Sequence, residues 1–166
     1  MILLVALLQG SAVADLDAEL RSANSATAVL QKRCAVPIRA DVDRAATKEA
    51  PPEVRADLGA GPDVTLVYRL VRLKCGERVY LRAENWYRPD RLTTEMNRAL
   101  LASDTPFGVV IRPLSPTRRT LATEFPDSDE GALRHRAIVI SGEGLPLAEV
   151  VESYPRDFPL RTPAAR

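Results

Sequence analysis

The chain has 166 residues, 46% hydrophobic and 27% charged, so its length and composition fit one globular domain and exclude a disordered, collagen-like or coiled-coil protein. Lysine and arginine number 23 against 22 aspartates and glutamates, which excludes the broad basic surface that nucleic-acid binding normally uses. Any charge that serves function therefore has to act locally.

The N-terminal segment has the pattern of a secretory signal. The first 14 residues carry no charge and end in Ser-Ala-Val-Ala at positions 11–14, the small-x-small form that signal peptidase cleaves. This predicts a signal peptide over residues 1–14 and an exported domain, periplasmic or extracellular, over residues 15–166. A buried N-terminal helix is the alternative, because no basic residue precedes the apolar stretch. That stretch is far shorter than the ~20 apolar residues of a membrane span, so no span is expected.

Helices and strands are expected in the following order in the first half of the domain. Residues 15–33 have leucines at helical spacing, and residues 38–42 alternate between apolar and charged as in a half-buried strand. Residues 45–63 are rich in proline and glycine, which predicts a loop. Residues 64–74 give the strongest strand signal, with residues 78–87 as a hairpin partner.

The second half contains further strands that follow one another through short connections. Residues 90–102 have the spacing of an amphipathic helix, and a second, short helix is expected after position 105. Strands are predicted over residues 118–125, 134–141 and 145–154. The fold class is therefore α+β, with one antiparallel sheet of about six strands, helices packed on one face, and a small enclosed pocket.

The two cysteines, Cys34 and Cys75, are the only ones in the chain. An even number in an exported protein permits one disulfide, and two free core residues are the alternative. A bridge requires Cα atoms within about 7 Å of each other. Two cysteines and one distant histidine do not supply the ligands of a zinc site, so no metal is expected.

Arg69 lies on a strand face that is otherwise apolar. Its neighbours on that face are Val67, Val71 and Leu73. Because burial of an unpaired guanidinium is unfavourable, Arg69 needs an anionic partner, either a carboxylate of the protein or a bound ligand.

The segment Thr105-Pro106-Phe107-Gly108 has the form of a helix start, with Thr105 as N-cap and Pro106 as first helical residue. The free amides of Phe107 and Gly108 would then point outward. Such amides, at the positive end of a helix dipole, favour a bound carboxylate.

Two glutamates fall in the last predicted strand, on opposite faces. Period-2 counting puts Glu149 on one face and Glu152 on the other, so one of them is expected inside, where it pairs with an arginine or transfers a proton. His135, the only histidine, lies between Arg134 and Arg136 and is interpreted as structural or exposed. No serine motif accompanies it, so a hydrolase triad is not supported.

Four segments occur in the order and approximate spacing of one enzyme family. They are SATAVL at 25–30, YRLVRLKC at 68–75, TPFG at 105–108, and RHR at 134–136 followed by LAEV at 147–150. The chain therefore resembles the chorismate pyruvate-lyases over nearly all of residues 15–166. The same fold is similar to the effector-binding domain of many bacterial transcription regulators.

The resemblance implies a site and an activity. Arg69 would bind one substrate carboxylate, and the backbone amides of Ala26 and Phe107 the other. Glu149 would be the acidic residue that handles the proton beside the ring hydroxyl, with Glu152 as the alternative because the spacing to the following proline differs. The implied reaction is elimination of pyruvate from chorismate, or a close analogue, to give 4-hydroxybenzoate, without a metal or organic cofactor.

Two other functions remain open at this point. The chain could be an exported binding protein that keeps the pocket for a small aromatic or carboxylate ligand and has no activity. It could also be a structural domain in which Arg69 and Glu149 pair with each other. The expected partner is a small aromatic carboxylate, not a nucleic acid or a membrane, and the chain is expected to be a monomer.

Overall fold

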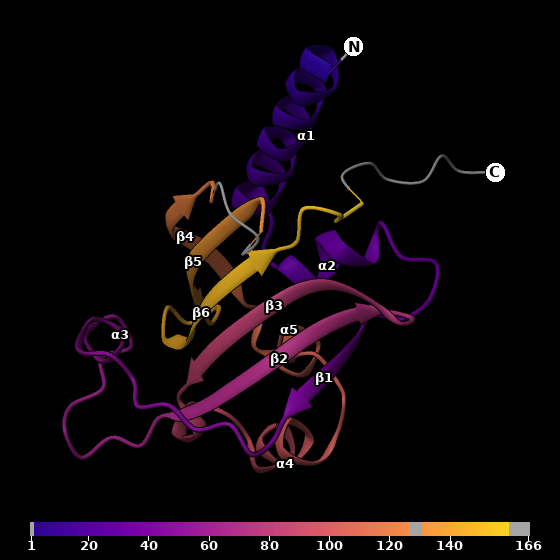
Figure 1. Cartoon of the computed structure of the whole chain (residues 1–166). Helices are drawn as coiled ribbons and strands as arrows, with labels where there is room; N and C mark the ends of the chain where they lie inside the picture. The colour runs from indigo at the N-terminus through magenta and orange to yellow at the C-terminus, as the bar shows by residue number, and fades with distance from the viewer. Residues whose placement is uncertain (1, 127–130, 160–166) are drawn as a thin grey trace.

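The protein is described by a computed structural model over residues 2–126 and 131–159, with side chains from residue 12 (Figure 1). Six strands of these residues form one sheet in the order β1-β2-β3-β6-β5-β4, and every neighbouring pair is antiparallel. The strands are β1 (Arg39–Asp43), β2 (Val67–Cys75), β3 (Arg78–Tyr87), β4 (Thr117–Glu124), β5 (Leu133–Ile140) and β6 (Pro146–Tyr154). The predicted antiparallel α+β sheet is confirmed.

The helices are short, apart from the first. They are α1 (Ile2–Ser22), α2 (Ala26–Gln31), α3 (Pro52–Asp57), α4 (Thr94–Ala102) and α5 (Phe107–Val110), with 3-10 turns η1 (Pro89–Arg91) and η2 (Arg112–Leu114). Side-chain caps begin two of them: Ser25 accepts the amide of Ala28 at α2, and Thr93 accepts the amide of Met96 at α4. Such caps satisfy amides that the first helical turn leaves free.

The sheet has two differently covered faces. The face that carries Arg69, Asn85 and Glu152, here called the cavity face, packs against α2, α4, α5 and the last turns of α1. The opposite face, here called the α3 face, carries Trp86 and Glu149 and is covered by α3.

Helix α3 departs from the prediction in two ways. It lies within residues 45–63, predicted to be a loop, and it puts a helix on the second face of the sheet. Pro52 occupies its first turn, where the missing amide hydrogen is no loss. Val54 and Leu58, four residues apart, are both buried and hold this short helix on the sheet, although the surrounding prolines and glycines conceal it in the sequence.

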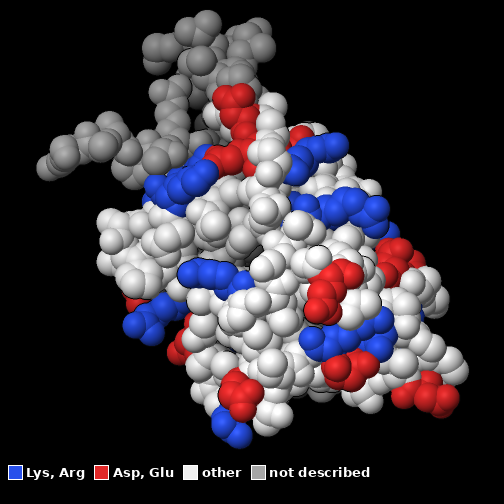
Figure 2. All heavy atoms as spheres, turned by 180° about the vertical axis from the view of Figure 1, so that it is seen from behind, with Lys and Arg blue, Asp and Glu red and all other residues white. Residues whose placement is uncertain are grey.

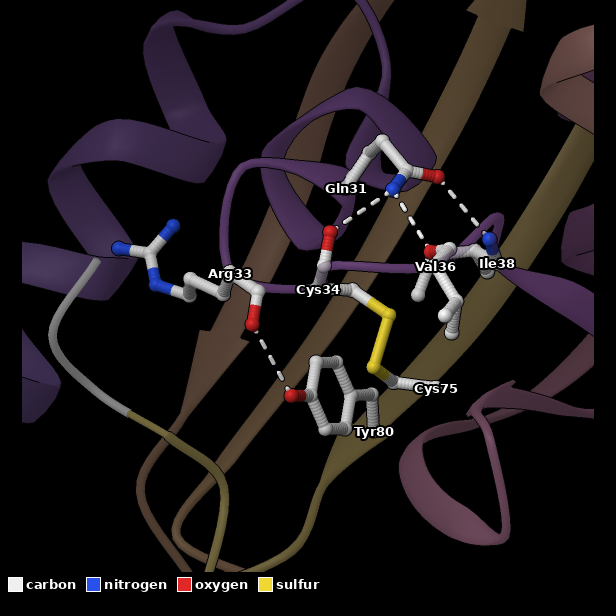
Figure 3. Close-up of a disulfide and its surroundings, with 7 residues drawn as sticks. All are labelled: Gln31, Arg33, Cys34, Val36, Ile38, Cys75 and Tyr80. Carbon is white, nitrogen blue, oxygen red and sulfur yellow. Dashed lines mark hydrogen bonds between the residues drawn. A yellow bond between two sulfur atoms is a disulfide. The ribbon is translucent and has the colours of Figure 1, made fainter. Parts of the chain in front are cut away.

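A disulfide joins Cys34 to Cys75, with their Cα atoms 5.7 Å apart (Figure 3). This settles the choice that the sequence left open in favour of a bridge. The side chain of Gln31 donates to the carbonyls of Cys34 and Val36 and accepts the amide of Ile38. The carboxyl end of α2 is thereby fixed to the end of β2.

Helix α1 is continuous from Ile2 to Ser22 and so includes the predicted cleavage position after residue 14. Leu16 and Leu20, which follow that position, are buried in the core of the cavity face. Among residues 2–126 and 131–159, no helix is both long and apolar enough to cross a membrane.

Candidate ligand-binding site

A cavity of ≈ 70 Å³ lies between the cavity face of the sheet and the beginnings of α2 and α5. Most of its wall is apolar: Val71, Leu73, Leu81, Ile111, Val139 and Val150. The charged residues that line it, within the described ranges, are Arg69, Arg118 and Glu152. Figure 2 shows the molecule from behind the view of Figure 1, with basic and acidic side chains interspersed and a small hollow among uncharged residues.

Arg69 of β2 is the one lining cation that makes no ion pair with any residue the structure describes. The residue is only 5% exposed, its Nε has no hydrogen-bond partner, and its Nη2 donates one long bond of 3.4 Å to the carbonyl of Thr105. Burial lowers the pKa of Arg69 from its ordinary value, because the charged form loses hydration. A bound anion at this position would offset that loss.

Asn85 adds a second unmatched polar group next to Arg69. The two residues are directly opposite each other in the β2–β3 register. Asn85 is 3% exposed, and its Oδ1 has no donor in the part of the chain that the structure describes. Buried polar groups are normally paired, so this pair of strands presents an incomplete hydrogen-bonding site.

The beginnings of α2 and α5 also reach the cavity. Ala26 and Phe107 are the first residues of these helices, and both line it, as the resemblance implied. The predicted helix start is wrong by one residue: Pro106 is extended and acts as N-cap, so α5 begins at Phe107. A Cβ on Gly108 would lie 3.0 Å from the Ser25 hydroxyl oxygen, so the two helix starts are closely packed.

Glu152 of β6 is the carboxylate that faces the cavity. Its Oε2 accepts hydrogen bonds from Nη2 of Arg118 at 2.5 Å and from the hydroxyl of Tyr154 at 3.1 Å. Its Oε1 accepts none from the residues that the structure describes. Arg118 and Glu152 thus neutralise each other, and one carboxylate oxygen is left for a ligand.

Glu149, the predicted acidic residue, does not line this cavity. It lies on the α3 face, opposite Trp86 and Ile138 in the register, and is fully buried with its Oε1 3.1 Å from Nε of Arg136. Burial raises the pKa of Glu149 to about 7, although the charge of Arg136 opposes the rise. The prediction that Glu149 shares a pocket with Arg69 is therefore wrong, because Glu149 points to the α3 face and Arg69 to the cavity face. Glu149 and Glu152 are three residues apart on one strand, so their side chains point to opposite faces. Glu152, the alternative, is on the correct face.

Arg118 and His135 are cavity-side residues that sequence reasoning did not single out for function. Arg118 joins Glu152 to the ring of His135, which is fully buried and bonds through Nε2 to Asp17. His135 and Asp17 are 118 positions apart in the chain. No local pattern signals such a contact.

Comparisons with known proteins support the fold. No family model matches the chain. An uncharacterised protein of Sinorhizobium fredii is 38% identical over 137 residues, covering 68% of this chain and 58% of that protein, so the chain spans less than two thirds of this relative's length. Among solved structures, the chain is similar to a possible transcriptional regulator from Bacillus subtilis, with a TM-score of 0.50, 16% identity, and coverage of 70% of this chain and 57% of that one.

A second similar structure is the effector-binding domain of the Bacillus subtilis trehalose repressor, with a TM-score of 0.47, 14% identity, and coverage of 77% of this chain and 97% of that one. The likeness to the possible regulator shows a shared fold. This is the predicted antiparallel α+β fold of regulator effector-binding domains. Membership in the lyase family itself stays a prediction.

Proposed function

We propose that this chain binds a small organic acid in the cavity, with the ligand's carboxylate at Arg69. The observation that carries the proposal is a guanidinium that is 5% exposed and makes no ion pair with any described residue. A buried charge without a partner is unfavourable, and an anion removes the imbalance. Arg118 does not compete for the anion, because Glu152 neutralises it. One net positive charge suits a single carboxylate.

The far end of the cavity favours a hydrogen-bond donor, because Oε1 of Glu152 is free to accept. Glu152 lies two strands away from Arg69 and is displaced by two residues along the strand direction. At ordinary sheet spacings this corresponds to about 12 Å between their Cα atoms. Apolar side chains line the space between them. At roughly 10–15 Å³ per water, the cavity has room for about five to seven water molecules, the scale of a single-ring acid. A ring with a carboxylate and an opposite hydroxyl, such as 4-hydroxybenzoate, matches both ends.

Calorimetric titration with 4-hydroxybenzoate tests the proposal. Arg69→Ala should weaken binding by about 30-fold or more, since the ligand's carboxylate is left buried without its cation. Arg72→Ala is the matched control, because Arg72 lies on the same strand, is exposed, and pairs with Asp41. Absence of binding to the parent, or equal losses in the two variants, would contradict the proposal.

A lyase is the second candidate. The observation that favours it is that Arg69, Ala26 and Phe107, the positions implied for substrate carboxylates, line one cavity. In the elimination, the ring carbon that bears the hydroxyl loses its proton, a ring double bond forms to the neighbouring carbon, and the C–O bond of the ether on that neighbour breaks. Enolpyruvate leaves and takes up a proton to become pyruvate, while the ring becomes aromatic. Glu152 is the group placed to handle a proton.

Pyruvate release from chorismate separates the two candidates. A lyase predicts release by the parent and by Glu149→Gln, which alters the other face of the sheet, but not by Glu152→Gln. A binding protein predicts no release by any of them, with 4-hydroxybenzoate still bound by the parent.

We also propose export of residues 15–166. The disulfide between Cys34 and Cys75 supports it, because disulfides persist in oxidising compartments. Intact-mass measurement of protein from the native host should give a chain that begins at Asp15. Recovery of the uncleaved chain from cytosol would overturn this proposal.

A further inference from the structure

We propose that Asp17 and His135 are positioning residues that hold Arg118, and through it Glu152, at the hydroxyl-binding end of the cavity. This inference rests on the proposed binding of a hydroxy acid in that cavity. It also gives the N-terminal helix α1, which carries Asp17, a part in ligand selection.

Arg118 is the centre of a buried hydrogen-bond network. Its side chain is 2% exposed and donates four bonds. Nη1 bonds to the carbonyl of Leu20 at 3.1 Å and to the hydroxyl of Thr120 at 3.0 Å, and Nη2 to Nδ1 of His135 at 3.2 Å and to Oε2 of Glu152 at 2.5 Å. Only one of these partners belongs to the ligand end of the cavity. The other three determine where the guanidinium plane lies, and therefore which oxygen of Glu152 remains free.

The direction of the bonds defines the state of His135. An arginine can only donate, so Nδ1 of His135 must accept and carries no proton. The ring is then the tautomer protonated at Nε2, which donates to Oδ1 of Asp17 at 2.8 Å. Asp17 is therefore the group that selects the tautomer, and the hydroxyl of Thr123 donates to the same oxygen of Asp17 at 3.4 Å. The contacts lead without interruption from α1 to Glu152.

Protonation of His135 would break this arrangement, because Nδ1 would become a donor facing the donor Arg118. The ionisable groups around the ring are Asp17 from α1, Arg118 from β4, and Glu152 and Tyr154 from β6. Burial lowers the pKa of His135 below its ordinary value, although the bond to Asp17 opposes the change. The ring is thus neutral at pH 7 and becomes charged only in more acidic solution.

The decisive measurement is the ratio of two affinities. 4-Hydroxybenzoate has a hydroxyl to donate to Glu152, whereas benzoate has only the carboxylate that Arg69 binds. Asp17→Ala should lower the preference for 4-hydroxybenzoate over benzoate by ~5- to 10-fold, as expected for a misplaced charged acceptor, and leave the affinity for benzoate within about twofold.

Glu19→Ala is the matched control. Glu19 lies on the same helix and pairs with Arg33 and Lys32, outside the network. It should leave the preference unchanged. Equal losses of the preference for 4-hydroxybenzoate in Asp17→Ala and Glu19→Ala would show that Asp17 acts only by stabilising α1. That result would overturn the inference.

His135→Asn separates positioning from mere packing. Asparagine keeps an oxygen acceptor near the place of Nδ1 but does not titrate. In the parent, the preference for 4-hydroxybenzoate should fall as His135 becomes protonated in acid, and in His135→Asn it should stay constant over the same range. The ligands' own carboxylates titrate alike, so they cancel in the ratio. A fall in preference of the same size in both proteins would contradict the inference.

A second measurement needs no ligand, because His135 is the only histidine in the chain. Its ring nitrogens in an NMR spectrum should show the tautomer protonated at Nε2, with the Nε2 proton protected in the parent and Glu19→Ala and lost to exchange in Asp17→Ala. The opposite tautomer, or an unaffected proton in Asp17→Ala, would overturn the inference. If the parent binds neither acid, the proposed function fails while this spectrum still decides the positioning role. If both acids bind but Asp17→Ala keeps the preference, the inference alone fails.

Discussion

Glu149 and Glu152 lie three residues apart on the same strand, and both are buried, but they face different environments. Glu152, on the cavity face, has a buried arginine at 2.5 Å and a tyrosine hydroxyl to match its charge. Glu149, on the α3 face, has only the half-exposed Arg136, and neither of its oxygens makes a well-aligned hydrogen bond to a described residue.

The difference shows that burial alone does not identify a functional carboxylate. Glu149 is the more deeply buried, and its pKa is raised to about 7 by burial and by the nearby charges of Asp57 and Glu53, against the opposing charge of Arg136. These are the features often sought in a catalytic acid. It nevertheless lies beneath α3 and apart from Arg69. Glu152, which lines the cavity, is the one that a ligand can reach.

The largest expected effect concerns the covalent link on the cavity face. Replacing both Cys34 and Cys75 with alanine opens a loop whose ends are 41 positions apart, which should lower the free energy of unfolding by about 4 kcal/mol. Urea denaturation gives the value, and the parent under reducing conditions should match the variant. Because α2 borders the cavity, binding of 4-hydroxybenzoate should weaken as well. Unchanged stability would mean that the disulfide does not stabilise the packing of α2 against the sheet.

Glu152→Gln should destabilise the protein by about 3 kcal/mol at pH 7, because it leaves the buried charge of Arg118 without its counterion. Denaturation midpoints of the variant and the parent at the same pH measure the loss. A variant as stable as the parent would show that the other hydrogen-bond partners of Arg118 compensate for the loss of Glu152. The glutamates on the two faces would then differ less in their contribution to stability than the contacts indicate.

Glu149→Gln should raise the free energy of unfolding at high pH, whereas Glu152→Gln lowers it. The folded pKa of about 7 exceeds the ordinary 4.5, so the folded parent holds a proton that the unfolded chain releases, and stability falls as pH rises from 4.5 through 7. The variant lacks this loss. It should be more stable than the parent by about 3 kcal/mol at pH 8 and show no gain near pH 4. Equal stabilities at pH 8 would mean that Glu149 ionises in the native state without penalty.

Gly108→Ala should have the smallest effect. The new Cβ would lie 3.0 Å from the hydroxyl oxygen of Ser25, which caps α2, so the hydroxyl has to move and the cap weakens by about 1 kcal/mol. Gly61→Ala is the control, because nothing lies within 4 Å of its Cβ. Thermal unfolding and titration with 4-hydroxybenzoate should both detect an effect of Gly108→Ala and no effect of Gly61→Ala.

Several features could be predicted from local sequence patterns. Alternation along a strand placed Arg69 on an apolar face, and that charge does line the cavity. Threonine and proline at positions 105 and 106 marked the start of α5 to within a residue. These predictions succeed because strand alternation and helix capping depend on residues close together in the chain. The antiparallel order of the later strands follows from their short connections.

The tertiary structure alone decided which face of the sheet became the cavity. Alternation separates Glu149 from Glu152 but does not say which side each helix covers, and the short α3, hidden among prolines, covers the side of Glu149. The pairing of Cys34 with Cys75 and of His135 with Asp17 likewise joins positions far apart in sequence. Such contacts form only when packing brings distant segments together, so the local sequence around each partner does not predict them.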